Sequence, residues 1–400
     1  MERGMSKGYK ITKITILSVV VLLAVLAVTL FTASGAQKKA KYLDPWKRDY
    51  FEQFEDPRLQ VIAHGLLAAN SHNLQPWKIR LDQQNPLLLY LYTDNERLAL
   101  ESDSLARQTL VSQGTFLEYM RVAGEQLGYP AEIVLFPDGE YDEQHLSESM
   151  ERKPVAKITL SKASPQNNPL YEFMFLPDTN RMAYQPDEIT SAQIRKLNKT
   201  NTDQDLILSI LNDKADIEKF GAYGVEGTEI ETGLRRMNDE SARIFRSNEY
   251  QKNKYRYGFS FEGQGTTGWK KHLLQGLITI IPFLNNEEAS TKLAVEAAQT
   301  AAGHTPSYAL ILSKDNSRTS QVKAGMLYSR LILTAHEEGL VMQPLSQVLQ
   351  EYPEMHEAYG KIHREYAAAG ETIQFLIRLG RPTQDTPLSM RREAVDLISE

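Results

Sequence analysis

The sequence predicts a protein of mixed helices and strands, built as two similar halves behind a single transmembrane helix. Three observations lead to this prediction. An uncharged, largely apolar run follows Lys13 and ends only at Lys38. Beyond it, segments with helical periodicity alternate with short apolar, strand-like segments. Near residue 165 the composition shifts to Ser, Pro, Gln and Asn, and a second set of helices and strands follows.

The overall composition excludes several classes of function. The chain has 400 residues, of which 42% are hydrophobic, and this is enough for a large core. Its net charge of −6, without a basic stripe, gives no sign of a nucleic-acid partner. It contains no cysteine, which rules out disulfides, cysteine-ligated zinc and a cysteine nucleophile. The eight histidines do not cluster, so we expect no metal site.

The N-terminal segment is expected to anchor the chain in a membrane. Residues 1–13 form a basic head, and residues 14–36 exceed the roughly 20 apolar residues that cross a bilayer. A signal peptide usually has a shorter apolar part of about 7–15 residues, although the small residues 34–36 leave cleavage open as an alternative. The flanking cations slightly favour an internal N-terminus and a periplasmic soluble domain. These cations are Arg3, Lys7, Lys10 and Lys13 before the span, and Lys38, Lys39 and Lys41 after it.

The remaining elements follow in order. Residues 37–55 are expected to form a linker. In the first half, residues 56–165, we expect helices over 59–69 and 106–127, strands over 87–92, 131–136 and 155–160, and an acidic loop over 137–153. In the second half, residues 166–400, we expect helices near 187–199, up to about 248, and over 272–284, 290–302 and 320–338, with strands near 205–210, 308–312 and 372–379. The similar order of elements suggests two related halves.

One polar turn lies between a helix and a strand in the first half, with the sequence Ala69-Asn-Ser-His-Asn-Leu-Gln-Pro-Trp77. Pro76 restricts Gln75 to an extended backbone, and Trp77 is suited to anchor the turn in the core. A plain interpretation is a helix cap followed by a turn, in which Asn and Ser make local hydrogen bonds.

The same turn resembles the S-x-N-x-Q-P-W signature of the flavin-dependent nitroreductase family. It is particularly similar to the single-chain, Acg-like branch, in which one polypeptide carries both halves of what is elsewhere a homodimer. The resemblance runs from about residue 56 to 393. Further segments fit in order: Arg107–Gly114 resembles R-x-x-x-x-S-x-G, Asp178–Tyr184 resembles R-[ST]-x-R-x-x-[FY], Gly339–Gln347 resembles G-L-x-x-x-P, and Leu379–Pro382 with Arg391 and Arg392 resembles the basic tail.

The resemblance implies an α+β, nitroreductase-like fold and one bound FMN. Arginine suits the dianionic phosphate because its planar guanidinium binds two oxygens at once. Asn and Gln amides each offer a donor and an acceptor to the ring. The cofactor-binding residues implied are Ser71, His72, Asn73 and Gln75 from the first half, and Asn180, Arg181, Leu345, Ser346, Gln347, Arg391 and Arg392 from the second.

The distribution of these motifs predicts a single composite site. The Q-P-W motif occurs only in the first half, and the arginine segments occur only in the second. One departure stands at Asp178, where the family has arginine, and an acid there is expected to weaken phosphate binding. Other interpretations stay open: Arg181 in a surface salt bridge, Arg391 and Arg392 as a solvated pair, and His72 in a structural hydrogen bond.

Residues 263–268 match G-x-G-x-x-G, but no apolar strand precedes them, so we do not expect a dinucleotide site there. This Gly-rich insertion is expected to be a mobile loop over the flavin. Residues 278–284 are then either a lid helix or an apolar patch that leans on the membrane.

The function expected from the resemblance is an FMN oxidoreductase. It would take a hydride from NADH or NADPH and reduce a nitroaromatic, a quinone or a similar acceptor. Because the cofactor carries this chemistry, no catalytic side chain is assigned. The soluble domain is expected to be monomeric, since its halves already imitate a dimer. Two alternatives remain: an FMN-sequestering protein without turnover, and a scaffold that has lost the cofactor.

Overall fold

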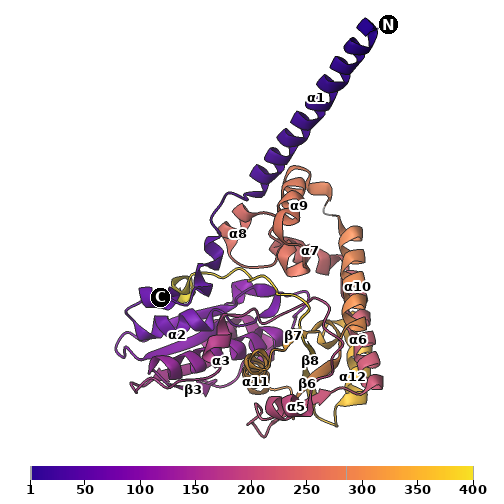
Figure 1. Ribbon diagram of the computed structural model, residues 1–400. Helices are drawn as coiled ribbons and strands as arrows, with labels where there is room; N and C mark the ends of the chain where they lie inside the picture. Colours follow the sequence, from indigo (N-terminus) through magenta and orange to yellow (C-terminus); the bar gives the residue numbers. More distant parts are fainter. Residues whose placement is uncertain (1, 285, 400) are drawn as a thin grey trace.

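The computed structural model describes residues 2–284 and 286–399. Its N-terminal helix α1 (Glu2–Ser34) projects from the body of the protein as a long rod (Figure 1). Within it, Ile11–Ser34 is long and apolar enough to cross a membrane, judged by length and composition, and no residue of its apolar 18-residue window is buried by the rest of the chain. The residues after the helix pack onto the domain: the short 3-10 helices η1 (Lys41–Trp46) and η2 (Tyr50–Gln53) bury three aromatic side chains, Tyr42, Trp46 and Tyr50.

The first half consists of a sheet with one long helix against it. Its elements are α2 (Pro57–Gly65), η3 (Ser71–Asn73), β1 (Trp77–Leu81), β2 (Leu88–Thr93), η4 (Asn95–Arg97), α3 (Arg107–Leu127), β3 (Ala131–Leu135), η5 (Glu143–His145), α4 (Leu146–Arg152), β4 (Ala156–Leu160) and η6 (Tyr171–Phe175). The strand order is β3-β4-β2-β1-β9, and the pairs are antiparallel except where β9 (Ile398–Ser399) runs parallel to β1. The end of the chain therefore returns from the second half to the first sheet.

The second half contains more elements because helices separate its first two strands. These elements are α5 (Ser191–Asn198), β5 (Leu206–Leu211), α6 (Lys214–Thr232), α7 (Arg235–Ile244), α8 (Glu249–Tyr255), η7 (Phe261–Gln264), α9 (Gly268–Ile280), η8 (Pro282–Leu284), α10 (Glu287–Gly303), β6 (Ser307–Ser313), α11 (Arg318–Glu337), β7 (Val341–Pro344), η9 (Gln347–Leu349), η10 (Pro353–Met355), α12 (His356–Tyr366), β8 (Thr372–Gly380) and η11 (Ala394–Leu397). The sheet order is β5-β6-β8-β7, and every pair is antiparallel.

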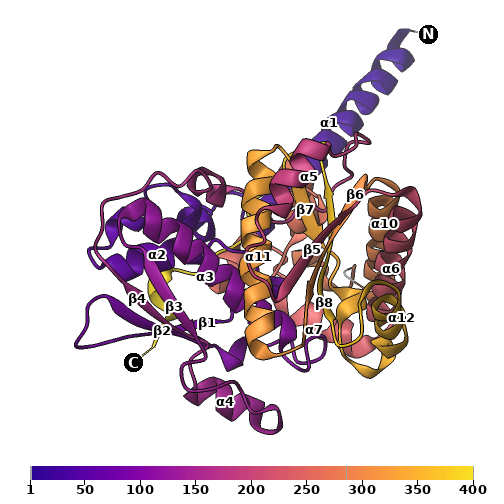
Figure 2. The same cartoon turned by 90° about the horizontal axis from the view of Figure 1, so that it is seen from below.

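The two sheets repeat one order of strands. In chain order, β1 to β4 are arranged as β3-β4-β2-β1, and β5 to β8 are arranged as β7-β8-β6-β5. In each half a long helix connects the second strand to the third, and these helices, α3 and α11, lie side by side between the sheets (Figure 2). They approach closely at two glycines. A Cβ on Gly114 would lie 1.9 Å from the Val322 carbonyl oxygen, and one on Gly325 would lie 2.0 Å from that of Val111.

Most of the predicted helices and strands are present within a few residues of their expected ends. Three strands were not predicted, β1, β7 and β9, and α4 lies in the segment 137–153 that was expected to be a loop. All three strands are short, and α4 has seven residues, so each carries too few residues to show a period. The apolar helix begins at Gly268 rather than at residue 272, and it ends before Pro282, which cannot continue it.

Candidate functional site

The polar turn of the first half has a strained backbone. His72, Asn73 and Gln75 have φ values of 50°, 52° and 54°, in the left-handed region that residues other than glycine rarely adopt. The expectation that Pro76 keeps Gln75 extended is therefore wrong, because hydrogen bonds from the Gln75 N–H to Asn70 and from its side chain to Arg256 hold the other conformation. Such strain is maintained only when neighbouring groups fix the backbone. Ser112 of α3 supplies two of these contacts: its hydroxyl accepts from the Ser71 N–H at 3.0 Å, and its carbonyl accepts from the Trp77 indole N–H at 2.8 Å.

The amide side chains of this turn bind distant parts of the chain. Asn73 donates to the Gly258 and Met390 carbonyl oxygens, both at 3.0 Å. Gln75, which is fully buried, donates to the Arg256 carbonyl oxygen at 2.9 Å, and its oxygen accepts from the Arg392 N–H at 2.8 Å. The turn is thus closed on one side by residues 256–258 and on the other by the C-terminal segment.

The two arginines of the tail are buried beside the turn. Arg391 donates to the Asn73 side-chain oxygen at 2.9 Å and to the Leu67 carbonyl oxygen at 2.7 Å, and its guanidinium lies over the Trp46 ring. Burial lowers the pKa of Arg391 to about 10. Arg392 donates to the Asp396 carbonyl oxygen at 2.5 Å, and burial lowers its pKa to about 10 as well. Neither arginine lies in a solvated charge pair.

Asp178 and Asn180 follow η6 and are also engaged with the protein. Asp178 accepts from the Ala69 N–H at 2.8 Å and from the Tyr119 hydroxyl at 2.5 Å. Burial raises its pKa to about 6, against the opposing charge of Arg391. The Asn180 N–H donates to the Met342 carbonyl oxygen at 2.8 Å, and its side-chain oxygen accepts from the Met182 N–H at 2.9 Å. Asp178, at the position where the resemblance expects arginine, therefore joins the two halves.

Arg181 differs from every other predicted arginine. Its side chain is exposed, and it makes no hydrogen bond or ion pair with any residue that the structure describes. The nearby hydroxyls of Tyr184 and Tyr328 already donate to the carbonyl oxygens of Asn180 and Asp178, at 2.7 and 3.1 Å. Partial desolvation by the surrounding protein lowers the pKa of Arg181, although its side chain stays accessible to solvent. An accessible guanidinium without a partner among the described residues is suited to bind an anion.

His72 lies within electrostatic range of both Arg181 and Glu240. The ring nitrogen Nε2 lies 3.4 Å from the Ser102 hydroxyl, which donates to Glu240 at 2.8 Å. Burial lowers the pKa of His72; the charge of Glu240 opposes this shift, and that of Arg181 adds to it. The imidazole is therefore neutral at pH 7, with one donor and one acceptor nitrogen.

Leu345, Ser346 and Gln347 follow β7 and lie against α6. The Leu345 N–H donates to the Leu376 carbonyl oxygen at 2.7 Å, and the Leu345 and Gln347 side chains fill the space that Gly224 and Gly227 leave open. This segment brings Gln347 to Glu231, a residue that the sequence did not single out.

Burial raises the pKa of Glu231 to about 7, while the amides of Gln350 and Gln347 favour its charged form. Its Oε2 atom and the Oε1 atom of Gln350 are buried without a hydrogen-bond partner among the described residues. The charge of Glu240 acts on both Glu231 and His72. No sequence signal marks Glu231, because it is one glutamate among several on a polar helix.

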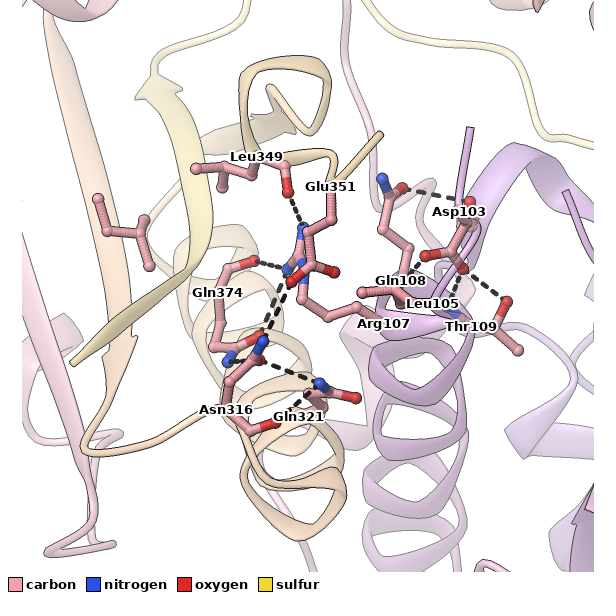
Figure 3. A network of polar contacts seen from close by, with 12 residues as sticks. Asp103, Leu105, Arg107, Gln108, Thr109, Asn316, Gln321, Leu349, Glu351 and Gln374 are labelled. Atoms are coloured by element: carbon pink, nitrogen blue, oxygen red, sulfur yellow. Dashed lines mark hydrogen bonds and ion pairs between the residues drawn. The ribbon is translucent and has the colours of Figure 1, made fainter. Parts of the chain in front are cut away.

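The segment Arg107–Gly114 joins the halves rather than forming an exposed site. Figure 3 shows Arg107 extending from the first turn of α3 toward the second half. It donates to the Leu349 carbonyl oxygen at 2.7 Å and to the Gln374 carbonyl oxygen at 3.0 Å, and its Nε lies 3.6 Å from a Glu351 oxygen. Arg318 begins α11 in the same way and donates to the Leu105 carbonyl oxygen of the first half at 2.6 Å. An arginine seven residues before a glycine thus occurs in both helices.

Six of the eleven predicted cofactor-binding residues fall into two groups. Asn73, Gln75, Arg391 and Arg392 meet in one hydrogen-bonded cluster. Arg181 lies outside that cluster, in the neighbourhood of His72. The helix α8 precedes the Gly-rich segment 263–268, so no strand leads into it. No group of three or more His, Asp or Glu side chains that could hold a metal occurs among the described residues.

No family model matches this sequence, and no curated protein does. Among solved structures, oxidized iodotyrosine deiodinase bound to FMN and 3-iodo-L-tyrosine is similar over 56% of this chain and 95% of its own, with 15% identity and a TM-score of 0.32. The FMN-dependent nitroreductase NfnB from Mycobacterium smegmatis, in complex with NADPH, is similar over 51% of this chain and 83% of its own, with 13% identity and a TM-score of 0.30. A nitroreductase with bound FMN from Desulfitobacterium hafniense DCB-2 is similar over 57% of this chain and 96% of its own, with 10% identity and a TM-score of 0.32.

Proposed function

We propose that this chain is a membrane-anchored, FMN-binding oxidoreductase of the nitroreductase type. In this proposal its two halves are related and take the places of two subunits around one composite site. The observation that carries the proposal is the unpartnered guanidinium of Arg181, close to His72 of the S-x-N-x-Q-P-W turn. The repeated strand order of the two sheets and the paired helices α3 and α11 support the relation between the halves.

The residues present suit FMN at both of its ends. Arg181 would bind the phosphate, because arginine matches phosphate oxygens and this one forms no ion pair with an acid among the described residues. The orphaned oxygens of Glu231 and Gln350, beside the segment Leu345–Gln347, would meet the polar edge of the ring. When bound, FMN supplies the uptake and release of two electrons.

The remaining cofactor-binding residues would act together with Arg181. Ser71, His72 and Asn180 would lie along the cofactor. Asn73, Gln75, Arg391 and Arg392 would hold the walls of the site through the contacts they make with one another and with residues 256–258.

The proposed reaction needs a donor and an acceptor. NADH or NADPH would deliver a hydride, and a nitroaromatic, a quinone or a similar small molecule would accept the electrons. Glu231 would hold a proton near neutral pH, since burial raises its pKa to about 7. The helix α1 would hold the domain on the extracytoplasmic side of a membrane, with the N-terminus inside.

The first test measures FMN binding by the full chain in detergent, and the quenching of flavin fluorescence reports the binding. The parent is expected to bind FMN. Arg181→Ala is expected to raise the Kd about 10- to 150-fold, because a hydrogen bond to a charged group contributes roughly 1.5–3 kcal/mol. Arg195→Ala, at an exposed arginine of α5, removes the same charge and is expected to leave the Kd unchanged. Equal affinity of the parent and Arg181→Ala would contradict the proposal.

A second candidate function is FMN sequestration without turnover. The contacts of residues 256–258 with Asn73 and Gln75 favour it, because the segment that leads into the Gly-rich insertion is hydrogen-bonded directly to the turn. Anaerobic addition of NADH or NADPH distinguishes the two functions, since the flavin absorbance is bleached only if the protein is an oxidoreductase. Arg256 also bonds to Glu393 and to the Lys41 carbonyl oxygen. If residues 256–258 cover the flavin, Arg256→Ala is expected to speed bleaching, and an unchanged rate would argue against a cover.

A further inference from the structure

The helix α9 lies directly against the C-terminal end of α1. A Cβ on Gly276 would come within 2.1 Å of the Leu30 carbonyl oxygen, so the two helices touch backbone to backbone. The His272 ring lies 5.9 Å from the Phe31 ring, and its Nδ1 atom lies 3.5 Å from the Ser34 hydroxyl. Because residue 272 meets residues 31–34 and residue 276 meets Leu30, the two helices run antiparallel. Figure 1 shows α9 beside the lower end of α1.

This packing extends into the apolar span. Ala27, Leu30 and Phe31 are partly covered, whereas most neighbouring residues of α1 are exposed. These residues belong to Ile11–Ser34, the segment that is long enough to cross a membrane. Ala27 lies about 10 Å from Ser34 along the helix, at 1.5 Å per residue. The C-terminal end of α9 therefore lies alongside residues that a membrane would surround.

The large hydrophobic side chains at the C-terminal end of α9 and in η8 are exposed. Phe283 is 79% exposed, Ile280 is 47% exposed and Leu284 is 41% exposed. Trp269, at the opposite end of the helix, is 62% exposed and precedes the exposed Lys270. An amphipathic Trp beside a Lys is typical of the membrane–water boundary, and aliphatic and Phe side chains are typical of greater depth. The acids Glu287 and Glu288 follow only in α10, which runs back toward the body (Figure 1).

The other face of α9 is fixed to the protein by buried charges. Lys271 pairs with Glu249 at 3.1 Å and with Glu262 at 3.0 Å, and Gln275 donates to Glu249 at 3.1 Å. Tyr42, just after α1, donates to the second oxygen of Glu249 at 2.7 Å. Burial alone would raise the pKa of Glu249, but Lys252 and these donors lower it to about 2. The cluster holds α9 in a fixed orientation, so a helix that swings over the flavin does not fit these contacts.

We propose that α9 and the turn Pro282–Leu284 form a second membrane contact, in the same leaflet as the C-terminal end of α1. Lipid acyl chains cover Ile280, Phe283 and Leu284, while Trp269 and Lys270 lie at the level of the headgroups. This rests on the proposed anchoring by α1. Continuity with the apolar span identifies the occupant, because the same lipid that surrounds Ala27 and Leu30 reaches the adjacent face of α9.

The first test measures tryptophan fluorescence of the full chain in phospholipid nanodiscs. The chain has three tryptophans, and Trp46 and Trp77 are buried, so Trp269 alone is exposed. Lipids brominated near the headgroup are expected to quench the emission of the parent, and Trp269→Phe is expected to remove that quenching. In the Trp269→Phe background, Phe283→Trp is expected to be quenched best by lipids brominated deep in the chain. Val134→Trp, on the edge strand β3 far from α1 (Figure 1), is expected to be unaffected.

The second test uses the absence of cysteine from the natural chain. Single variants Phe283→Cys, Val134→Cys and Val21→Cys are treated with a charged maleimide in nanodiscs and again in SDS. Positions 283 and 21 are expected to react about tenfold or more slowly than position 134 in nanodiscs, because a charged reagent is excluded from hydrocarbon. All three are expected to react equally in SDS.

The outcomes separate this inference from the anchor on which it rests. Fast labelling at both 21 and 283 would overturn the anchor and the second contact together. Protection at 21 with fast labelling at 283 would overturn the second contact alone. Protection at 283 without quenching of Phe283→Trp by brominated lipid would mean that a protein surface covers the patch, and this also overturns the proposal.

Discussion

Adding one methyl group at Gly114 perturbs the closest approach between the two halves. The new Cβ would lie 1.9 Å from the Val322 carbonyl oxygen, whereas real Cβ atoms essentially never come within 3.0 Å of another heavy atom. The obstacle is a backbone atom inside α11, and no side-chain rotation relieves it. The helices α3 and α11 must therefore separate by about 1 Å, which weakens the dispersion contacts along their whole interface.

The expected loss of unfolding free energy in Gly114→Ala follows from two opposing effects. Overpacking a core usually lowers the free energy of unfolding by about 1–3 kcal/mol. Because the Val322 carbonyl belongs to the backbone of a helix and cannot rotate away, Gly114→Ala is expected near the upper end of this range. Alanine favours a helix over glycine by about 1 kcal/mol, which leaves a net loss of about 2 kcal/mol. With an unfolding entropy near 2.1 cal/mol/K per residue, this lowers the Tm of a domain of this size by about 3 °C. Gly325→Ala, with its Cβ 2.0 Å from the Val111 carbonyl oxygen, is expected to behave alike.

The assay is thermal unfolding followed by circular dichroism, with Gly303→Ala as the matched control. Gly303 ends α10, and a methyl group added there would meet no other atom within 4 Å, so the control is expected to be neutral or slightly stabilising. Because Gly325 lies against Gly114, one separation accommodates both methyl groups, and the double variant is expected to lose less than the sum of the singles. Melting of Gly114→Ala at the same temperature as Gly303→Ala would refute the close crossing.

Two further predictions concern buried polar groups. Arg107→Lys presents one nitrogen where the guanidinium binds both Leu349 and Gln374, so it is expected to cost about 3 kcal/mol and lower the Tm by about 4 °C; an unchanged Tm would contradict this. Burial lowers the pKa of His64 to about 4, below its ordinary value of 6.5. As the pH falls, the His64 imidazole therefore takes up a proton in the unfolded chain before it does so in the folded protein. The contribution of His64 to the free energy of unfolding is complete above pH 6.5 and declines as the pH falls toward 4. Between pH 7 and 5, the free energy of unfolding of His64→Gln, measured by denaturant titration, is expected to fall by about 2 kcal/mol less than that of the parent. Equal decreases in the two proteins would show that His64 does not control this decline.

Periodic patterns along the chain determined most of the secondary structure. The helix α3 and the strands β2, β4, β6 and β8 follow from runs that are long or apolar enough to show their period. The strand β7 has four residues, and the helix α4 lies in an acidic segment, so neither carries such a signal. The repeated arginine and glycine of α3 and α11 were a signal in the sequence, but two matching positions become recognisable only when the helices are seen to pair.

The sequence by itself determined an apolar span, the order of helices and strands, and a polar turn with two separate arginine segments. These features depend on neighbouring residues, and local patterns specify them. Only the tertiary structure decided which groups meet: Gln75 bonds to Arg256, 181 residues away, and Asn73 bonds to Met390, 317 residues away. It also decided that Arg181 has no ion pair with any of the described residues and that α9 lies on α1. Such contacts arise when separate elements pack together, and no local period records them.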